Sequence, residues 1–130
     1  MAIAYAAPNN NEKVFIGEIF YAWWNRTEKV TFYKVVGIPN KKEVEVVEIG
    51  FDIISERYRE DGKYIGEVIP NPSDVLGKKF QTRLLLKREK CLLKKYPQFL
   101  VCDNSVDGKV YAYKIHRGND VFETTLESSS

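Results

Sequence analysis

Cysteine and histidine are almost absent from this chain of 130 residues, which holds only Cys91, Cys102 and His116. Two cysteines outside a CxxC pair and one histidine cannot provide the clustered ligands of a structural zinc site. We therefore expect no metal and no cofactor. Both cysteines lie in apolar surroundings, which favours reduced, buried thiols, with a disulfide across a hairpin as the alternative.

Long hydrophobic runs are missing as well. No stretch approaches the about 18 apolar residues that a membrane-spanning helix needs. The first residues, MAIAYAAPNNNEK, lack the basic region and the apolar run of a signal peptide. We therefore expect a cytoplasmic protein with no membrane contact. Asn25-Arg26-Thr27 matches a glycosylation sequon, and without a signal peptide it is better interpreted as a turn.

Catalytic signatures are also scarce. The eight glycines are scattered, so the chain has no Gly-rich phosphate loop. His116 stands alone, and no serine or cysteine has a base beside it in the sequence. The four acidic residues between 52 and 61 are more typical of a solvated turn than of a metal site. We predict that the protein is not an enzyme.

Alternating apolar residues are what the chain does contain. Strand-like segments separated by turn signals span 14–24, 30–36, 43–49, 64–69, 79–88, 98–103, 110–115 and 121–125. The segment 50–60 is compatible with a short helix or a further strand. Short turns between the first three segments predict an antiparallel meander. We expect an all-β fold with at most one short helix, forming a small barrel or sandwich.

One domain accounts for the chain length. Residues 1–12 end in a polar, turn-like sequence and are expected to form a flexible N-terminal arm. Residues 13–125 hold the strand pattern and are expected to be the single β-rich domain. The polar residues 126–130 are expected to be a disordered tail.

Aromatic residues are plentiful, with seven Phe, eight Tyr and two Trp. Alternating aromatics in an all-β protein mostly pack in the core, but beside basic residues they can also stack on nucleic-acid bases. Trp23 and Trp24 are adjacent, and adjacent strand residues point to opposite faces. One of them must therefore leave the main core unless a bulge intervenes. Trp24 is our candidate for the contact surface.

Positive charge is concentrated in residues 78–95. This segment has eight basic residues and one acid, Glu89, although the whole chain has a net charge of only +2. Outward lysines on a hairpin discourage edge pairing, and this solvated face is the alternative to a binding role. A basic stripe can also follow phosphates or an acidic protein surface. The candidate contact residues here are Lys79, Arg83, Lys87, Arg88, Lys90, Lys94 and Lys95.

Short sequence motifs near the two ends of the chain resemble those of a known protein family. Gly17-Glu18-Ile19-Phe20 and Phe32-Tyr33-Lys34-Val35-Val36 resemble a family of small, largely uncharacterised proteins from phages and mobile elements. Tyr111-Ala112-Tyr113 and Phe122-Glu123-Thr124 are similar to the end of that family. The turn at Trp24-Asn25-Arg26 departs from the family's Trp-Gly-Tyr. The resemblance implies a phage or mobile-element origin and carries no activity.

A binding role agrees best with these observations. We expect a non-enzymatic accessory protein that binds a host protein or protein–nucleic-acid complex, for example as an inhibitor of a host defence system. Such a protein needs only an exposed aromatic anchor and a charged rim. The alternative is a nucleic-acid-binding β-barrel that uses the basic segment 78–95 directly.

Overall fold

The computed structural model describes residues 14–88, 95–103, 108–115 and 120–126. Within these ranges nine strands form one antiparallel sheet without any helix, which confirms the predicted all-β class. The strands are β1 (Ile19–Trp24), β2 (Lys29–Asn40), β3 (Glu43–Tyr58), β4 (Tyr64–Val75), β5 (Phe80–Arg83), β6 (Leu85–Arg88), β7 (Lys95–Asp103), β8 (Gly108–Lys114) and β9 (Phe122–Thr125). The expected arm 1–12 and the tail beyond Leu126 lie outside the described residues.

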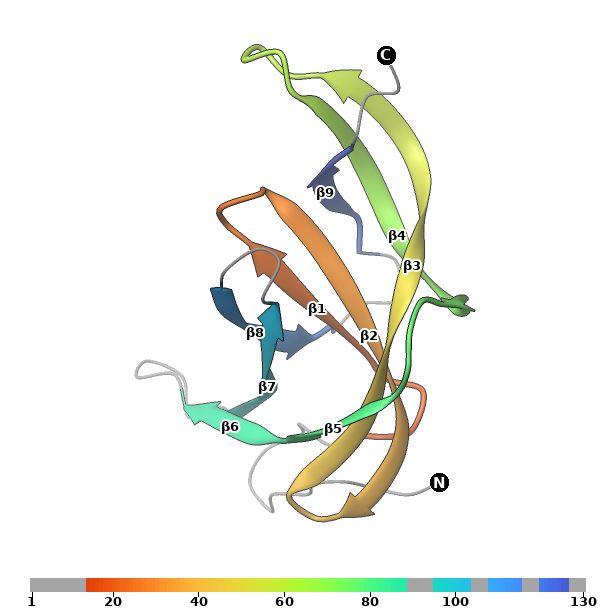
Figure 1. The fold of residues 1–130 in the computed structure, drawn as a ribbon, viewed down its shortest axis with the longest axis vertical. Helices are drawn as coiled ribbons and strands as arrows, with labels where there is room; N and C mark the ends of the chain where they lie inside the picture. Colours follow the sequence, from red (N-terminus) through yellow and green to blue (C-terminus); the bar gives the residue numbers. More distant parts are fainter. Residues whose placement is uncertain (1–13, 89–94, 104–107, 116–119, 127–130) are drawn as a thin grey trace.

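The strand order is β6-β7-β8-β1-β2-β3-β4-β9, with β5 paired to β3 (Figure 1). β1, β2 and β3 are consecutive in the chain and in the sheet, so the expected meander is confirmed. The order is open, and the sheet is not closed into a barrel. The narrower expectation of a small barrel or sandwich stays a prediction.

Three strands extend beyond the lengths that their sequences predicted. β2 continues through the expected turn at 37–42, with register shifts on both sides of Gly37. β3 continues to Tyr58, so the ambiguous segment 50–60 is mostly strand. β4 includes Pro70 and Pro72, which were expected in a loop. Pairing with a neighbouring strand and bulge-like irregularities therefore outweigh these local turn signals.

The predicted strand 79–88 is divided at Leu84. β5 ends at Arg83 and pairs with β3, whereas β6 begins at Leu85 and pairs with β7. Leu84 is buried, and its N–H donates to the carbonyl oxygen of Lys42 at 2.7 Å. The chain therefore passes from one part of the sheet to another at a single buried residue, and the sheet curls around it.

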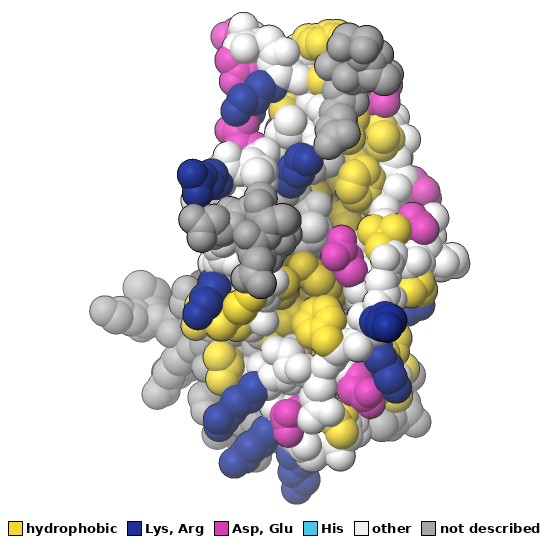
Figure 2. Space-filling view, in the orientation of Figure 1, with side chains coloured by type: hydrophobic (Ala, Val, Ile, Leu, Met, Phe, Trp, Pro, Cys, Tyr) yellow, Lys and Arg dark blue, Asp and Glu magenta, His cyan; other side chains and the backbone are white. Residues whose placement is uncertain are grey.

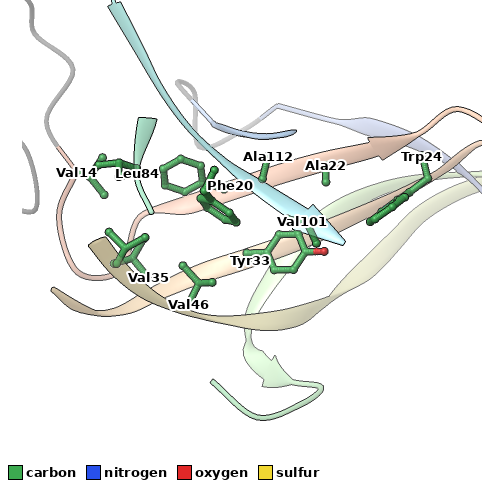
Figure 3. Close-up of a cluster of buried hydrophobic side chains, with 12 residues drawn as sticks. Val14, Phe20, Ala22, Trp24, Tyr33, Val35, Val46, Leu84, Val101 and Ala112 are labelled. Atoms are coloured by element: carbon green, nitrogen blue, oxygen red, sulfur yellow. The ribbon is translucent and has the colours of Figure 1, made fainter. Parts of the chain in front are cut away.

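Two hydrophobic cores lie on opposite faces of the central strands. The inner core, inside the curl, contains Val14, Phe20, Ala22, Trp24, Tyr33, Val35, Val44, Val46, Leu84, Phe99, Val101 and Ala112 (Figure 3). The outer core contains Val30, Phe32, Val47, Ile49 and Val68, with Ile19, Tyr21, Phe51, Ile115 and Phe122 packed against them. Successive residues of β2 and β3 alternate between the two cores, as the period of two requires. Val46 and Val47, adjacent in β3, therefore belong to different cores.

β9 covers the outer core where β3 has left β2. β2 pairs with β3 from Asn40 back to Phe32, and beyond that point β3 pairs with β4. β9 pairs with β4 and also reaches the start of β2. Its Thr124 hydroxyl accepts a hydrogen bond from the N–H of Val30 at 3.1 Å, and the N–H of Thr125 donates to the Glu28 carbonyl at 2.9 Å. These bonds satisfy the N–H of Val30 and the carbonyl of Glu28, at the end of β2 that does not pair with β3.

Candidate functional site

Trp23 and Trp24 point to opposite faces of β1. Trp24 is only 5% exposed and belongs to the inner core, whereas Trp23 is 40% exposed. The expectation that one tryptophan is core and the other is outside is confirmed without a bulge in the β1–β2 register. The expected surface position of Trp24 is corrected, because the exposed member of the pair is Trp23. Nothing in the local sequence distinguishes the two positions. The partners of β1 in the sheet decide it.

An exposed aromatic surface surrounds Trp23. We call it the outer aromatic face, and its residues are Tyr21 and Trp23 of β1 and Tyr111 and Tyr113 of β8. Tyr21 is opposite Tyr113 in the β1–β8 register, with ring centroids 6.0 Å apart. Trp23 and Tyr111, each about 40% exposed, follow next on the same face. With Val110, the four aromatics line a shallow hollow of about 360 Å³.

The aromatic rings are held in place by their neighbours. The Nε1–H of Trp23 donates to the side-chain oxygen of Asn25 at 2.9 Å. Tyr21 packs on Phe122 with a centroid distance of 5.0 Å, which joins the outer aromatic face to the outer core. Burial raises the pKa of Tyr21, and the charges of Tyr113 and Asp120 raise it further, so its hydroxyl stays neutral at physiological pH. The face is therefore aromatic and uncharged at its centre.

Lys79 and Arg83, two of the predicted contact residues, lie next to acids of β3. The Lys79 Nζ is 3.2 Å from the Glu45 carboxylate, although its side chain is 67% exposed. Arg83 is opposite Glu43 in the β3–β5 register. Hydrogen bonds from Gln81 and Asn40 lower the pKa of Glu43, and the charge of Arg83 adds to this effect. The first half of the basic segment is therefore partly neutralised by β3.

The second half of the basic segment forms the β6–β7 hairpin. Lys87 and Arg88 are in β6, and Lys95 begins β7 as the register partner of Arg88. Lys90 and Lys94 lie outside the described residues. β7 is next to β8, so this hairpin belongs to the same part of the sheet as the outer aromatic face. Figure 2 shows hydrophobic side chains reaching the surface in the middle of one face of the molecule, with Lys and Arg side chains at the upper left, on the right and at the lower end.

Other chemistries find little support in the described part of the chain. Within it no group of three or more His, Cys, Asp or Glu side chains could hold a metal ion. Cys102 is an exposed free thiol, so the expectation of burial is wrong for this residue, and Cys91 and His116 lie outside the described ranges. None of the described residues belongs to a helix long and apolar enough to cross a membrane.

Comparison with known proteins adds no relative. No protein-family model, no curated protein and no solved structure matches the chain. The candidate site therefore depends on the geometry of this molecule alone. Sequence reasoning chose Trp24 instead of Trp23 and missed Tyr111 as a site residue. The alternation in Tyr111-Ala112-Tyr113 was a signal that both tyrosines share a face, but the pairing of β8 with β1 joins residues about 90 positions apart and has no local signature.

Proposed function

We propose that this chain is a non-enzymatic binding protein that docks onto another protein through its outer aromatic face. The observation that carries the proposal is the pair Trp23 and Tyr111, which lie on adjacent strands and keep about 40% of their surface exposed. Trp and Tyr are the residues that most often dominate binding energy at protein interfaces. A face built on paired strands also loses little conformational freedom on binding, which favours affinity.

The origin of the chain belongs to the same proposal. The resemblance of its two ends to small proteins of phages and mobile elements supports an accessory role inside a host cell. The partner that we propose is a host protein, with inhibition of a host defence system as the form of action. Basic residues of the β6–β7 hairpin would form part of the polar rim around the aromatic anchor.

We further propose that the strands around the inner core form an open barrel. β5 and β6 are separated only by Leu84, so one run of chain connects a strand paired to β3 with a strand paired to β7. This arrangement supports an open barrel around the inner core. A curled sheet of this kind would present the outer aromatic face on a stiff support.

Paired variants test the docking surface. Trp23→Ser and Tyr111→Ser remove the exposed rings, and Tyr58→Ser is the matched control because Tyr58 is 69% exposed and belongs to the β3–β4 hairpin. Partners recovered from host extract by the wild type are identified, purified and titrated by calorimetry. We expect Trp23→Ser to weaken binding by at least about tenfold, as for an interface hot spot, with the control unchanged. Equal affinity of all three variants would refute this use of the face.

Single-stranded nucleic acid is the second candidate partner. Aromatics on adjacent strands beside the Lys- and Arg-bearing β6–β7 hairpin are the combination that stacks bases and contacts phosphates. The test is a fluorescence titration with a labelled oligonucleotide at several salt concentrations. Phosphate contacts predict an affinity that falls steeply with salt and falls again when Lys87 and Arg88 are changed to Glu. Absence of binding at low salt rules this candidate out.

A further inference from the structure

The side chains of the outer aromatic face form two rows that run across the strands. In one row Leu100 of β7 is the register partner of Tyr111 of β8, and continuation of the β1–β8 register places Trp23 beside Tyr111. These three side chains are between 36% and 41% exposed. In the other row Tyr113 of β8 is opposite Tyr21 of β1. Rings of both rows line the hollow of about 360 Å³, which is therefore a shallow groove between them.

The spacing along the strands suits a flat ring held in this groove. Residues two apart on an antiparallel strand, such as Tyr111 and Tyr113, are about 6.8 Å apart along it. Carbon atoms in contact are about 3.5–4.0 Å apart, so a flat group between two rings needs a gap of about 7–8 Å. The two rows are thus separated by about the thickness that the ring of a proline side chain requires.

The distance across the strands suits a polyproline II helix. Neighbouring strands lie about 4.8 Å apart, and β8 alone separates β7 from β1, so the backbones of Leu100 and Trp23 are about 9.6 Å apart. A polyproline II helix repeats every three residues, over about 9.3 Å. Residues i and i+3 of such a helix would therefore contact both ends of the exposed row, one over β1 and the other over β7.

The polar groups of the face suit a ligand that is rich in acceptors. Among the described residues, the hydroxyls of Tyr111 and Tyr113 have no hydrogen-bond partner, so both can donate to a ligand. A polyproline II segment offers carbonyl oxygens that make no internal hydrogen bonds, and its prolines have no N–H. The described lining of the groove includes no charged side chain. We propose that the groove binds a proline-rich segment of the partner protein in the polyproline II conformation. This inference rests on docking through the outer aromatic face and names the part of the partner that docks.

The charges beside the groove predict the residues that flank the prolines. Lys109 is exposed, two residues before Tyr111 on β8, and no described residue forms an ion pair with it. The β7 end of the groove also leads to the basic β6–β7 hairpin. At the β1 end, burial and then the charges of Tyr113 and Asp120 raise the pKa of Tyr21, so a carboxylate lies near that end. Acidic residues should therefore adjoin the prolines at the end of the segment that lies over β7.

A synthetic peptide tests the proposal directly. The probe is decaproline with two glutamates at one end. Its mirror image, made from D-amino acids, is the control, because it has the same composition and charge but the opposite helical hand. In the ¹⁵N-labelled chain the indole N–H signals of Trp23 and Trp24 report on opposite faces of β1, and Trp23→Phe assigns them. We expect the L-peptide to shift the Trp23 signal alone and to bind at least about fivefold more tightly than its mirror image.

Two variants of one residue locate the binding in the groove. Tyr111→Leu, which removes a ring, should weaken binding of the L-peptide at least about fivefold, and Tyr111→Phe, which removes only the hydroxyl, should weaken it less. Tyr58→Ser, on the β3–β4 hairpin, should leave the affinity unchanged. A peptide with two lysines in place of the glutamates should bind more weakly at low salt.

Three results would overturn the proposal. They are equal affinity for the two mirror-image peptides, a Trp23 signal that stays constant up to high millimolar peptide, and a Trp23 signal that responds to a single-stranded oligonucleotide but not to the peptide. The docking proposal is tested separately by the effect of Trp23→Ser on binding of the host partner. If Trp23→Ser weakens that binding while the peptide fails, the face docks a partner through a segment of another kind. If neither effect is found, both proposals fail.

Discussion

Two neighbouring tryptophans contribute to this molecule in different ways. Trp24 packs in the inner core and donates its indole N–H to Thr31, whereas Trp23 lies at the surface against Asn25. A buried tryptophan stabilises the fold through the large apolar surface that it removes from water. A half-exposed tryptophan contributes less to folding and leaves that surface free for a partner.

Truncation of the two tryptophans should separate stability from binding. We expect Trp24→Ala to lower the free energy of unfolding by about 3–5 kcal/mol, because it leaves a cavity in the inner core. Trp23→Ala should cost less than about 1 kcal/mol. Urea unfolding followed by far-UV circular dichroism measures both values. Similar losses for the two variants would contradict the assignment of Trp23 to the surface.

Glu28 joins three parts of the chain at the β1–β2 turn. Its backbone is in the left-handed region, with φ of 54°, and its carbonyl oxygen accepts hydrogen bonds from the N–H and hydroxyl of Thr125. Its carboxylate accepts from Lys63 at 2.7 Å and from Arg59 at 2.9 Å. These two bonds lower the pKa of Glu28, the Lys63 bond having the larger effect. The β3–β4 turn is thereby tied to the β1–β2 turn.

The pH dependence of stability should report on this carboxylate. Because the folded-state pKa of Glu28 lies below its ordinary value of 4.5, its contribution is complete above that pH and is lost as the pH falls through the folded value. Glu28→Gln should therefore have a lower Tm than the wild type at pH 7, and the difference should narrow below pH 4.5. Thermal unfolding from pH 7 to pH 3 measures it. A deficit that stays constant with pH would assign the loss to the turn itself.

Asp61 provides a matched comparison in the same cluster. Arg59 donates two hydrogen bonds to its carboxylate and, with the N–H of Lys63, lowers the pKa of Asp61 from 3.8 to about 2. The Tm deficit of Asp61→Asn should therefore persist at pH 3.8 and narrow only toward pH 2. Both side chains are well solvated, so both deficits should shrink at high salt.

At the scale of elements, the short strand β9 connects β4 to the start of β2, where β2 and β3 have separated. It has four residues, and two of them bond to the β1–β2 turn and to the start of β2. Thr124 is buried, and its hydroxyl accepts a hydrogen bond from the N–H of Val30. At this point β3 pairs with β4 and no longer with β2. A side chain thus takes the place of a strand partner.

Thr124 therefore offers a test of how β9 is attached. Thr124→Val keeps the shape but leaves the buried N–H of Val30 without an acceptor, and we expect a loss of about 1–3 kcal/mol in the free energy of unfolding. Thr124→Ser keeps the hydroxyl and should lose less. Chemical denaturation gives both values, and amide hydrogen exchange at Val30 should be faster in the valine variant alone. If serine is as destabilising as valine, packing of the methyl group matters more than the hydrogen bond.

At the scale of the whole molecule, two cores share one layer of strands. β2 places Tyr33 and Val35 in the inner core and Val30 and Phe32 in the outer core. Neither core can lose this strand without exposing the other. We therefore expect a single cooperative unfolding transition.

Val46 and Val47 test this coupling, because they are adjacent in β3 and belong to different cores. Each change to Ala should lower the free energy of unfolding by about 2 kcal/mol, from lost burial and a residual cavity. Val75→Ala, at a position 53% exposed, is the control and should have little effect. Scanning calorimetry should show one transition for every variant. A second transition in either valine variant would mean that the cores unfold separately.

The sequence predicted the elements better than it predicted their ends. Alternation located the central meander, and it places adjacent residues such as Val46 and Val47 on opposite faces, because side-chain direction depends only on the local period. Local turn signals failed at Gly37, Pro70 and Pro97, which lie inside strands. Pairing with a neighbouring strand stabilises these positions, and a neighbour that is distant in the chain leaves no trace in a local window.

The candidate site, too, was predicted in part from the local sequence and decided in part by long-range strand pairing. The sequence by itself determined that the chain is all-β, that aromatics are plentiful and basic residues are concentrated in 78–95, and that one tryptophan must leave the core. Only the tertiary structure decided that it is Trp23, because β8, which is distant in the sequence, lies on the side of β1 away from β2. It also separated the basic segment, placing Lys79 and Arg83 against acids of β3 and the β6–β7 hairpin beside β8. The physical reason is common to both outcomes: a strand's period fixes which side chains share a face, but long-range pairing fixes what covers that face.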